Sequence, residues 1–513
     1  MSVADPANVS KIRTLAELAD LVETFHKQGK QVVHCHGVFD LLHVGHLRHF
    51  EAARRFGDVL IVTLTPDRWV NKGPLRPAFD EQLRLEMLSG LSCIDFVGLN
   101  EWPTAVETIA RLKPDVFVKG SEFVDRSKDI TGAIAKEEAA VVAVGGRLEF
   151  TDDVTFSSSN LINRYLPQIS KDAAEFVGRF RSKYGVDDVA AYLERAKDLK
   201  VLVIGESIID EYNYCEALGK SGKEPILAVK ELATERFAGG ALAVANHLAG
   251  FTEHVGLVSM LGKSDTCEAF VREKLNPNVA ASFLYMSGAP TIVKRRFIES
   301  YPFQKMFEVY RMGEDQDAAA NSARLLSTLR DTLPRYDLVV VSDYGHGLMD
   351  EAAIELVASE AKCLAVHTQA NAGNFGFNTV SKYPRADFIC VSEKEIRLEA
   401  RQRQKDLYRI VEQATAKLGA SRALITRGQQ GALCWGKEEG FTIVPALAGH
   451  FNDRLSAGDA VLAVSSLCVP QGAPAEMMAL VCNAVGAMAV ETVGNRSSIE
   501  RTPLLRFLGS LFK

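Results

Sequence analysis

His43 and His46 flank a Val-Gly pair shortly after the apolar run Gln31-Val32-Val33. The surrounding string starts at Gly37 and reads Gly-Val-Phe-Asp-Leu-Leu-His-Val-Gly-His. Glycines let the backbone approach phosphates, and imidazoles donate hydrogen bonds to the charge that builds on a phosphoryl group during its transfer. The string therefore predicts a turn that faces phosphate at the start of a helix.

A second candidate site lies far along the chain, in the run Asp-Arg-Leu-Ser-Ala-Gly-Asp-Ala that begins at Asp453. Transfer of a phosphoryl group to a sugar hydroxyl needs a base near the acceptor and donors around the moving phosphate. Asp459 would accept the hydroxyl proton. The N–H groups of Ala457, Gly458 and Asp459, at a helix N-terminus, would form an anion hole.

Short apolar runs alternate with amphipathic stretches throughout the chain, which predicts α/β architecture with parallel sheets covered by helices on both faces. In the first part we expect strands at 59–64, 96–99, 116–118 and 141–144. We expect helices there at 47–56, 82–91 and 104–112. In the second part we expect strands from 200 onward and at 255–260, 338–342, 363–367, 388–391, 423–426 and 432–435.

The length of 513 residues exceeds one ordinary core and indicates more than one domain. Helical spacing between residues 170 and 199 indicates a helical linker. We therefore predict domains at 1–168 and 199–513, joined by a linker at 169–198. Two segments with period-two character, 226–232 and 291–299, predict a small separate sheet that acts as a lid.

The formal net charge is −6, with 47% apolar and 24% charged residues. This balance is typical of a soluble globular protein and gives no reason to expect nucleic acid or a membrane surface as a partner. No apolar run approaches the roughly 18 residues that span a bilayer, and the N-terminus lacks a signal-peptide pattern. Nine cysteines without a Cys-x-x-Cys pair indicate reduced thiols and a cytoplasmic protein.

The first predicted domain resembles the HxGH nucleotidyltransferases, specifically their cytidylyltransferase-like branch. Later segments match that family in order: a basic loop at 72–77, a strand end at Lys119-Gly120 and a hydroxyl-rich helix start at Ser157-Ser158. The resemblance implies that His43 and His46 contact the triphosphate and stabilise the transition state. It also implies nucleotide or phosphate contacts for Gly37, Phe39, Asp40, Gly45, Lys72, Arg76, Arg84, Lys119, Ser157 and Ser158. Just before these serines, Asp152 and Asp153 stand where the family often carries a basic segment.

The second predicted domain resembles the ribokinase-like (PfkB) sugar kinases over nearly its whole length. The segment 205–210 resembles a strand end with a substrate-binding aspartate, the Gly239-Gly240 turn resembles the family's Gly-Gly signature, and 453–460 resembles its DTxGAGD signature. The resemblance implies catalysis by Asp459 and sugar binding by Asp210, Gly239 and Gly240. It also implies nucleotide or phosphate binding by Thr426, Gly428, Ser456, Ala457 and Gly458.

Three positions depart from the kinase pattern: Ser456 replaces the first anion-hole glycine, and Ala243 and Ser392 replace asparagines. A serine fits the anion hole if its φ is negative. Glu395 keeps the acid of the family's Asn-x-x-Glu segment, which is linked to metal and phosphate. Three alternatives stay open. The second domain is an active carbohydrate kinase, or it is a degenerate kinase-like domain that serves as a scaffold or binds sugar without catalysis. In the third alternative the whole protein is a non-catalytic nucleotide-binding regulator.

Together the two domain types resemble the bifunctional heptose-phosphate kinase/adenylyltransferases of lipopolysaccharide precursor synthesis, in which the kinase half comes first. The resemblance implies nucleotidyl transfer from ATP or CTP to a sugar phosphate such as a heptose phosphate, with pyrophosphate release, and ATP-dependent phosphorylation of a sugar or sugar phosphate. The product would enter lipopolysaccharide or capsule synthesis. Mg²⁺ is implied for both halves, because a triphosphate's charge needs screening. The edges of a lid sheet could pair with a second copy, which would make a homodimer.

Overall fold

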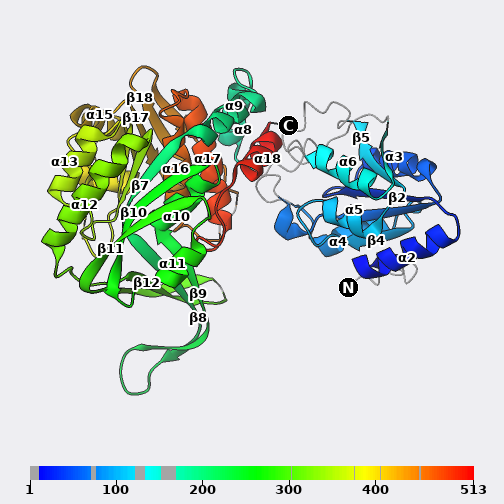
Figure 1. Cartoon of the computed structure of the whole chain (residues 1–513), viewed down its shortest axis with the longest axis horizontal. Helices are drawn as coiled ribbons and strands as arrows, with labels where there is room; N and C mark the ends of the chain where they lie inside the picture. Colours follow the sequence, from blue (N-terminus) through cyan, green and yellow to red (C-terminus); the bar gives the residue numbers. More distant parts are fainter. Residues whose placement is uncertain are drawn as a thin grey trace. The chain divides into compact units, whose positions relative to one another are not determined.

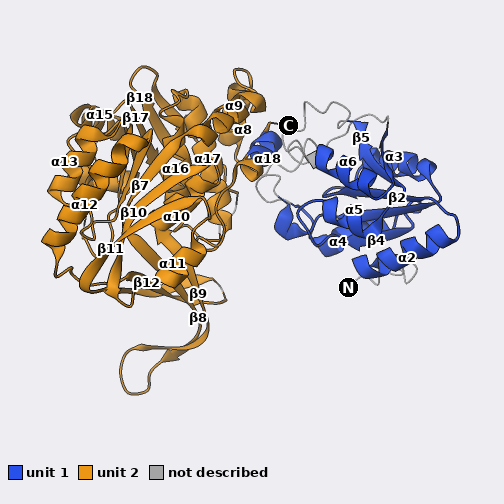
Figure 2. Ribbon diagram, in the orientation of Figure 1, with its two compact units in different colours: residues 1–168, 505–511, 513 blue, residues 169–504, 512 orange. Residues whose placement is uncertain are grey.

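The computed structural model describes residues 11–70, 77–121, 133–151, 169–301, 303–374, 376–404, 406–449 and 452–512. Two compact units divide the chain (Figure 2). Unit 1 comprises residues 1–168 with 505–511, and unit 2 comprises residues 169–504 with Phe512. Each unit has its own sheet and its own hydrophobic core.

Unit 1 contains one sheet of six parallel strands in the order β1-β4-β3-β2-β5-β6. The strands are β1 (Ile12–Arg13), β2 (Val32–Gly37), β3 (Val59–Leu64), β4 (Phe96–Leu99), β5 (Val116–Gly120) and β6 (Arg147–Thr151). The chain leaves β2 for β3 on one side and later returns to β5 on the other. This reversal of strand order creates a crevice at the carboxyl ends of β2 and β5, where open α/β sheets bind ligands.

Helices cover both faces of this sheet (Figure 1). The face with α3 (Val44–Ala53) and α4 (Glu81–Ser89) carries one apolar cluster, and the face with α2 (Leu15–Lys27), α5 (Val106–Leu112) and α6 (Ala133–Ala143) carries two. Single 3-10 turns follow at Arg54–Phe56 and Asp67–Trp69.

The strand predicted at 141–144 is wrong, because these residues end α6 and the following strand is β6. Val141 is buried, whereas its neighbour Val142 is 62% exposed. The run is therefore part of an amphipathic helix. Periodicity alone does not distinguish a short apolar segment of a helix from a buried strand.

Unit 2 contains a sheet of nine strands in the order β11-β10-β7-β14-β15-β16-β17-β18-β19. It is parallel from β11 to β17, and β18 and β19 are antiparallel. The strands are β7 (Lys200–Gly205), β10 (His254–Ser264), β11 (Val279–Pro290), β14 (Leu338–Asp343), β15 (Leu364–Thr368), β16 (Phe388–Ser392), β17 (Arg422–Thr426), β18 (Ala432–Gly436) and β19 (Gly440–Val444). Every strand predicted for this sheet is confirmed within one to four residues at its ends.

The helices of unit 2 form two layers around this sheet (Figure 1). On one side lie α10 (Ala241–Ala249), α16 (Ala457–Cys468) and α17 (Ala475–Glu491). On the other lie α12 (Ala318–Thr332), α13 (Glu351–Glu360), α14 (Glu393–Glu399) and α15 (Leu407–Leu418). The remaining helices of unit 2 are α8 (Lys171–Arg181), α9 (Val186–Arg195), α11 (Glu268–Lys274) and the start of α18 (Arg501–Leu511), whose residues from 505 onward belong to unit 1. The 3-10 turns of unit 2 lie at Ala196–Asp198, Leu333–Arg335, Val380–Lys382 and Gly428–Gln430.

A second, four-stranded sheet stands apart in unit 2, in the order β13-β12-β8-β9. Its strands are β8 (Ser207–Lys220), β9 (Leu227–Gly240), β12 (Ile292–Glu299) and β13 (Gln304–Arg311). The prediction of a small separate sheet from two period-two segments is therefore confirmed. The β8–β9 hairpin extends well beyond its neighbours (Figure 1), and Leu218, Ile226, Leu227 and Leu232 are exposed on it.

Candidate active sites

The His43–His46 segment of unit 1 lies at the crevice predicted by the strand order. His43 is the N-cap of α3, and its Nδ1 accepts a hydrogen bond of 3.1 Å from the N–H of Gly45. Since Nδ1 is an acceptor, the proton of the neutral ring is on Nε2. Burial lowers the pKa of His43, which favours this neutral form. The ring of His46 stacks on that of His43, with centroids 4.0 Å apart.

Phe39 explains why the histidine string begins with glycine. Phe39 has a φ of +47°, in the left-handed region. This conformation folds its ring back over Gly37, where a Cβ atom would come within 2.9 Å of the ring. The same ring packs edge-on against His46 and Phe50. Gly37 and Phe39 therefore position His46. The sequence had predicted that these two residues contact phosphate.

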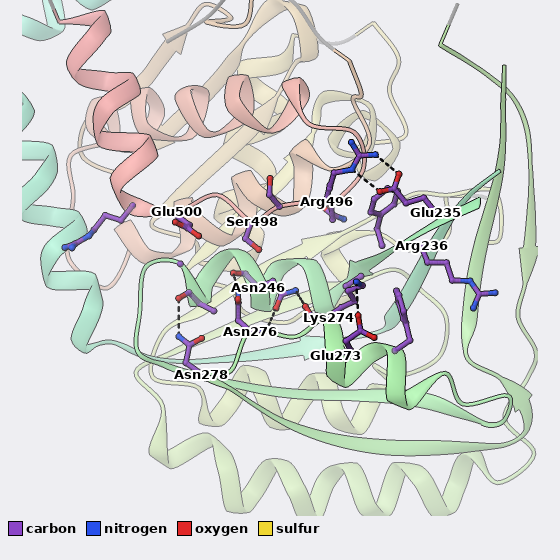
Figure 3. Close-up of a pocket in the computed structure, with 18 of the residues that line it drawn as sticks. Glu235, Arg236, Asn246, Glu273, Lys274, Asn276, Asn278, Arg496, Ser498 and Glu500 are labelled. Atoms are coloured by element: carbon purple, nitrogen blue, oxygen red, sulfur yellow. Dashed lines mark hydrogen bonds and ion pairs between the residues drawn. The ribbon is translucent and has the colours of Figure 1, made fainter. Parts of the chain in front are cut away.

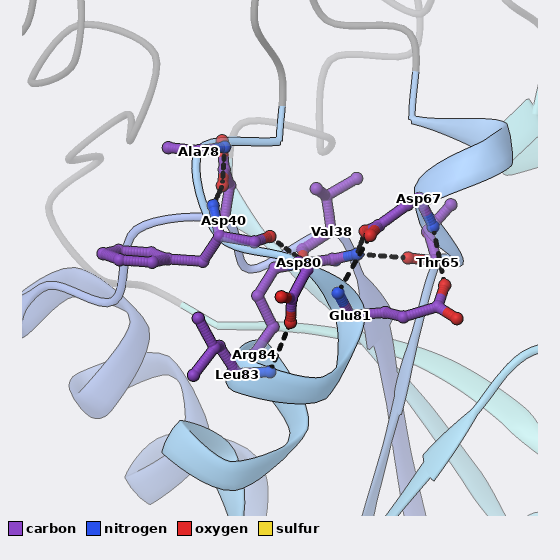
Figure 4. Close-up of polar contacts among 10 residues, drawn as sticks. Val38, Asp40, Thr65, Asp67, Ala78, Asp80, Glu81, Leu83 and Arg84 are labelled. Atoms are coloured by element: carbon purple, nitrogen blue, oxygen red, sulfur yellow. Dashed lines mark hydrogen bonds and ion pairs between the residues drawn. The ribbon is translucent and has the colours of Figure 1, made fainter. Parts of the chain in front are cut away.

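Arg84 and Asp40 hold the loops around this crevice (Figure 4). The guanidinium of Arg84 has no exposed surface, and it donates to the carbonyls of Val38, Thr65 and Phe79 and to the carboxylate of Asp67. Oδ1 of Asp40 accepts from the N–H groups of Ala78 and Phe79, at 2.6 and 3.2 Å. The structure thus gives both residues a positioning role, because these hydrogen bonds join them to other groups of the protein.

Lys119 lies at the carboxyl end of β5, and its Nζ is 2.8 Å from the carboxylate of Glu137. Two histidines of β2 that sequence reasoning missed lie beside this strand. The hydroxyl of Thr63 joins Nε2 of His34 to Nδ1 of His36, at 2.8 Å each. Burial, together with the charge of Lys119, lowers the pKa of His34 to about 3, so this histidine is neutral. The predicted phosphate contacts Lys72, Arg76, Ser157 and Ser158 lie outside the described residues.

In unit 2, the Gly-Gly turn and Asp210 fit together sterically. Asp210 lies on β8 and is paired in register with the end of β9. A Cβ atom on Gly239 would come within 2.0 Å of Oδ2 of Asp210, so only glycine leaves room for this carboxylate. Gly240 follows with a φ of +60° and forms the N-cap of α10. The predicted sugar-binding residues are therefore adjacent in the structure.

Asp459 lies in the first turn of α16 and is buried. Its Oδ1 accepts a hydrogen bond of 2.6 Å from the hydroxyl of Tyr344. Burial raises the pKa of Asp459 to about 6, and the hydrogen bond from Tyr344 and the charge of His367 act in the opposite direction. A carboxyl group with this pKa is well matched to accept a proton near neutral pH.

Glu206 positions the loop that carries Tyr344, a link that sequence reasoning missed. The side chain of Glu206 is fully buried at the end of β7. Its two carboxylate oxygens accept from the N–H groups of Tyr344 and His346, both at 2.9 Å. Burial and the nearby charge of Asp343 raise the pKa of Glu206 to about 7. The carboxylate of Glu206 thus orients the loop so that the Tyr344 hydroxyl reaches Asp459.

A cavity of about 240 Å³ connects these groups. Its lining includes Asp210 from β8, Lys294 and Arg296 from β12, and Ser456 and Asp459 at the start of α16. The small sheet therefore supplies one wall and the N-terminus of α16 supplies another. Arg296 is paired with the carboxylates of Asp210 and Glu308. Lys294 is only 4% exposed, and it forms no ion pair or hydrogen bond with any residue that the structure describes.

The N-terminus of α16 has the geometry of an anion hole. Within the described ranges, the N–H groups of Ala457, Gly458 and Asp459 donate to no other group of the protein. Ser456 has a φ of −83° and a ψ of −12°, so the serine fits here without strain. Asp453 anchors the run that leads to α16, because its carboxylate accepts from Tyr212, Lys305 and Gly494.

Residues 198–502 match the family model "pfkB family carbohydrate kinase". The chain belongs to the pfkB family. Residues 34–164 match a second family model, "Cytidylyltransferase-like". The resemblances stated for the two parts of the sequence are therefore confirmed.

Relatives and a solved structure agree with these families. Unit 1 is 41% identical over 160 residues to "Bifunctional protein HldE" of Syntrophotalea carbinolica, which covers 31% of this chain and 31% of that protein. It is 38% identical over 166 residues to the protein of the same name from Trichlorobacter lovleyi, with 32% of each chain covered. The chain thus matches about a third of the length of these relatives. Phosphofructokinase-2 from Escherichia coli, in a point-mutant form, superposes with a TM-score of 0.50 at 14% identity, covering 61% of this chain and all of that chain, which shows the fold alone.

Thr426, Gly428, Ser392 and Glu395 are further residues of the pfkB pattern. Thr426 ends β17, and Gly428 follows with a φ of +56° at the start of a 3-10 turn. Ser392 and Glu395 form a reciprocal cap of α14, because each side chain bonds the other's backbone N–H. The second oxygen of Glu395 accepts from the N–H of Ala370.

A larger hollow of about 1000 Å³ lies elsewhere in the pfkB unit, between β9, α10, α11 and the segment 495–502 (Figure 3). The cations of its lining are paired with acids: Arg496 with Glu235, Lys274 with Glu273, Arg236 with Glu211 and Arg501 with Glu194. Asn246 and Asn276 bond each other. Asp459 does not line this hollow, whereas it does line the smaller cavity.

Within the described ranges, no three His, Cys, Asp or Glu side chains come together as a metal site. None of the helices described is both long enough and apolar enough to cross a bilayer.

Proposed function

We propose that the protein is a bifunctional enzyme of nucleotide-sugar synthesis. Unit 1 transfers a nucleotidyl group from ATP or CTP to a sugar phosphate and releases pyrophosphate, and unit 2 uses ATP to phosphorylate a sugar or sugar phosphate. The observation that carries the proposal is the cavity of unit 2, where Asp459 lies beside the unpartnered N–H groups of α16. A base and an anion hole on one cavity are the two elements that phosphoryl transfer to a hydroxyl requires.

The charges of the cavity favour an anionic acceptor. Lys294 is buried between the rings of Tyr310 and Tyr344, with Nζ 5.2 and 5.3 Å from their centroids, and it lacks an acidic partner among the described residues. Burial lowers its pKa, and the nearby charges of Asp210, Glu308 and Asp459 act in the opposite direction. A ligand with negative charge would favour the charged form of Lys294 further. A sugar phosphate supplies that charge, and Asp210 would accept hydrogen bonds from its hydroxyls. A heptose phosphate is the acceptor that the HldE relatives of unit 1 suggest.

In unit 1 the chemistry rests on the stacked histidines at the N-terminus of α3. Nε2–H of His43 would donate to the triphosphate, and His46 would stabilise the charge that develops on the phosphorus oxygens. The positive end of α3 adds to this stabilisation. The sugar phosphate would attack the α-phosphorus, and pyrophosphate would leave.

Mg²⁺ would accompany the triphosphate in each unit. In unit 2 the carboxylate of Glu395 is oriented by the N–H groups of Ser392 and Ala370. One protein carboxylate together with phosphate oxygens and water is a common ligand set for Mg²⁺, so Glu395 fits this role. The ion would screen the charge of the transferring phosphate.

The competing proposal is an active transferase fused to a kinase-like scaffold. Mass spectrometry of products from a matrix of ATP and CTP with sugars and sugar phosphates separates the two. We expect both a nucleotide-linked sugar and a newly phosphorylated sugar. His46→Ala should remove the first product and Asp459→Asn the second. A wild-type protein that yields only the nucleotide-linked sugar supports the scaffold, and one that yields no product supports a nucleotide-binding regulator.

We also propose that the small sheet mediates a homodimer, because the β8–β9 hairpin exposes Leu218, Ile226, Leu227 and Leu232 at the sheet's edge. Exposed apolar residues on a strand edge favour pairing with another chain. Light scattering of the Leu218→Lys, Leu232→Lys variant should give the monomer mass if this edge is the interface. The cytoplasm is the proposed compartment, since ATP is available there and the structure records all nine cysteines as free.

A further inference from the structure

Ser456 occupies the position before α16 where a serine usually caps a helix. Such a serine accepts a hydrogen bond from the second or third N–H group of the helix. Here the side chain makes no such bond, and its backbone is in the right-handed helical region. The N–H groups of α16 therefore stay available for a ligand, and the hydroxyl has another role.

The hydroxyl of Ser456 is a polar atom without a partner. Ser456 is 5% exposed, and its Oγ is shielded from solvent and bonds no described residue. Buried hydroxyl groups almost always have a hydrogen-bond partner, so an unpartnered one calls for an explanation. Ser456 and Asp459 line the same cavity and are three positions apart, which places both on one side of the first turn. A ligand at the start of α16 would reach the hydroxyl and the carboxylate together.

We propose that the Ser456 hydroxyl donates a hydrogen bond to the phosphoryl group as it moves from ATP to the acceptor; this inference rests on the proposed kinase function. In that step the bond between the γ-phosphorus and the β,γ-bridging oxygen breaks, and ADP leaves with the electron pair. The acceptor oxygen forms the new bond to phosphorus, and its proton passes to Asp459. Ser456 keeps its own proton throughout.

This role explains how the chain uses a serine where the pfkB signature has glycine. A glycine contributes only its N–H group to the anion hole. A serine with a negative φ keeps that N–H group and adds an O–H donor beside it. Negative charge on the phosphoryl oxygens is stabilised by donors that are already in place before the reaction. Ser456 is therefore a catalytic residue of this chain rather than a sign of a degenerate site.

The test compares Ser456→Ala with Ser466→Ala in the full-length protein. Ser466 is a buried serine of the same helix, but its hydroxyl donates to the carbonyl of Ala463 and does not line the cavity. We expect Ser456→Ala to lower kcat for sugar phosphorylation about 100-fold, as for the loss of one transition-state donor, with the KM for ATP unchanged. Ser466→Ala should keep the wild-type kcat.

A binding measurement separates the proposed role from a structural one. ADP with aluminium fluoride and the acceptor sugar mimics the transition state, and its affinity should fall in Ser456→Ala by the same factor as kcat. The affinity for ADP alone should not change, which also shows that the variant is folded. Equal kcat in Ser456→Ala and wild type refutes the role of Ser456 while leaving the kinase intact. A wild-type protein without any sugar-dependent ATP turnover refutes the proposed kinase function and this inference with it.

Discussion

Replacing Tyr344 with phenylalanine removes the hydrogen bond of 2.6 Å that its hydroxyl donates to Oδ1 of Asp459. The phenol stabilises the ionised carboxylate, which is the form that accepts the acceptor's proton. Burial raises the pKa of Asp459 to about 6, and this hydrogen bond limits the rise. The pKa of Asp459 should therefore be higher in Tyr344→Phe than in the wild type.

The size of the shift follows from the strength of the bond. A hydrogen bond to a charged group contributes about 1.5–3 kcal/mol. At about 1.4 kcal/mol for each pKa unit, its loss raises the pKa of Asp459 by about one to two units. Activity requires the ionised form, so it is lost as the pH falls through this pKa. The acid side of the rate profile should move upward by that amount, whereas rates well above the new pKa should approach those of the wild type.

The assay is ADP release as a function of pH, read as kcat/KM for the acceptor, which reports groups of the free enzyme. Tyr383→Phe is a matched control, because the Tyr383 hydroxyl also donates to a buried carboxylate, Asp343, at 2.6 Å, but Tyr383 does not line the cavity. This control should keep the wild-type midpoint. A Tyr344→Phe profile that is lower at every pH but has an unchanged midpoint would refute the proposed tuning of Asp459.

Three further predictions concern other parts of the two sites. His46→Ala should lower nucleotidyl transfer about 100- to 1000-fold and leave sugar phosphorylation unchanged, measured as pyrophosphate and ADP release; equal losses of both contradict separate sites. Gly239→Ala should raise the KM for the sugar about 10-fold, because the added Cβ would displace the Asp210 carboxylate. Gly178→Ala is the control and should not change this KM, because a Cβ atom at Gly178 would contact no other group. Asp459→Asn should abolish phosphorylation yet raise the melting temperature at pH 8. The pKa of Asp459 is raised on folding, so this carboxyl group favours the folded state only at pH values below about 6. A lower melting temperature of the variant at pH 8 contradicts this prediction.

The inner strands of the two large sheets could be predicted because they are largely buried and therefore read as continuous apolar runs. The four strands at the edges of these sheets, β1, β6, β11 and β19, were not predicted. The same signal failed at 141–144, where an apolar run belongs to the edge of α6. The sequence pattern also predicted only two of the four strands of the small sheet. Strands β8 and β13 were not predicted, because their burial alternates irregularly and much of the hairpin is exposed. An irregular pattern of this kind has no clear period in the sequence.

Local motifs in the sequence indicated candidate residues for the two sites, but they could not predict all of the contacts that these residues make. Arg84 resembled a ligand contact, whereas the structure shows a buried guanidinium that bonds four protein acceptors. Tyr344 and Glu206 were missed as partners of the catalytic region. Tyr344 is 115 positions from Asp459, and Glu206 is 138 positions from Tyr344. Contacts at such separations depend on the packing of the whole sheet and leave no local spacing to read.

The three departures from the kinase signature acquire physical explanations once the backbone is known. Ser392 caps α14 and orients Glu395, so the loss of an asparagine leaves the acid in a fixed position. Ala243 is buried within α10 and does not line the cavity. Ser456 keeps a negative φ and leaves the N–H groups of α16 available. At Ser392 and Ser456 the local backbone geometry is retained while the side chain changes. The backbone of the anion hole is retained at Ser456. This is why we favour an active kinase over a scaffold.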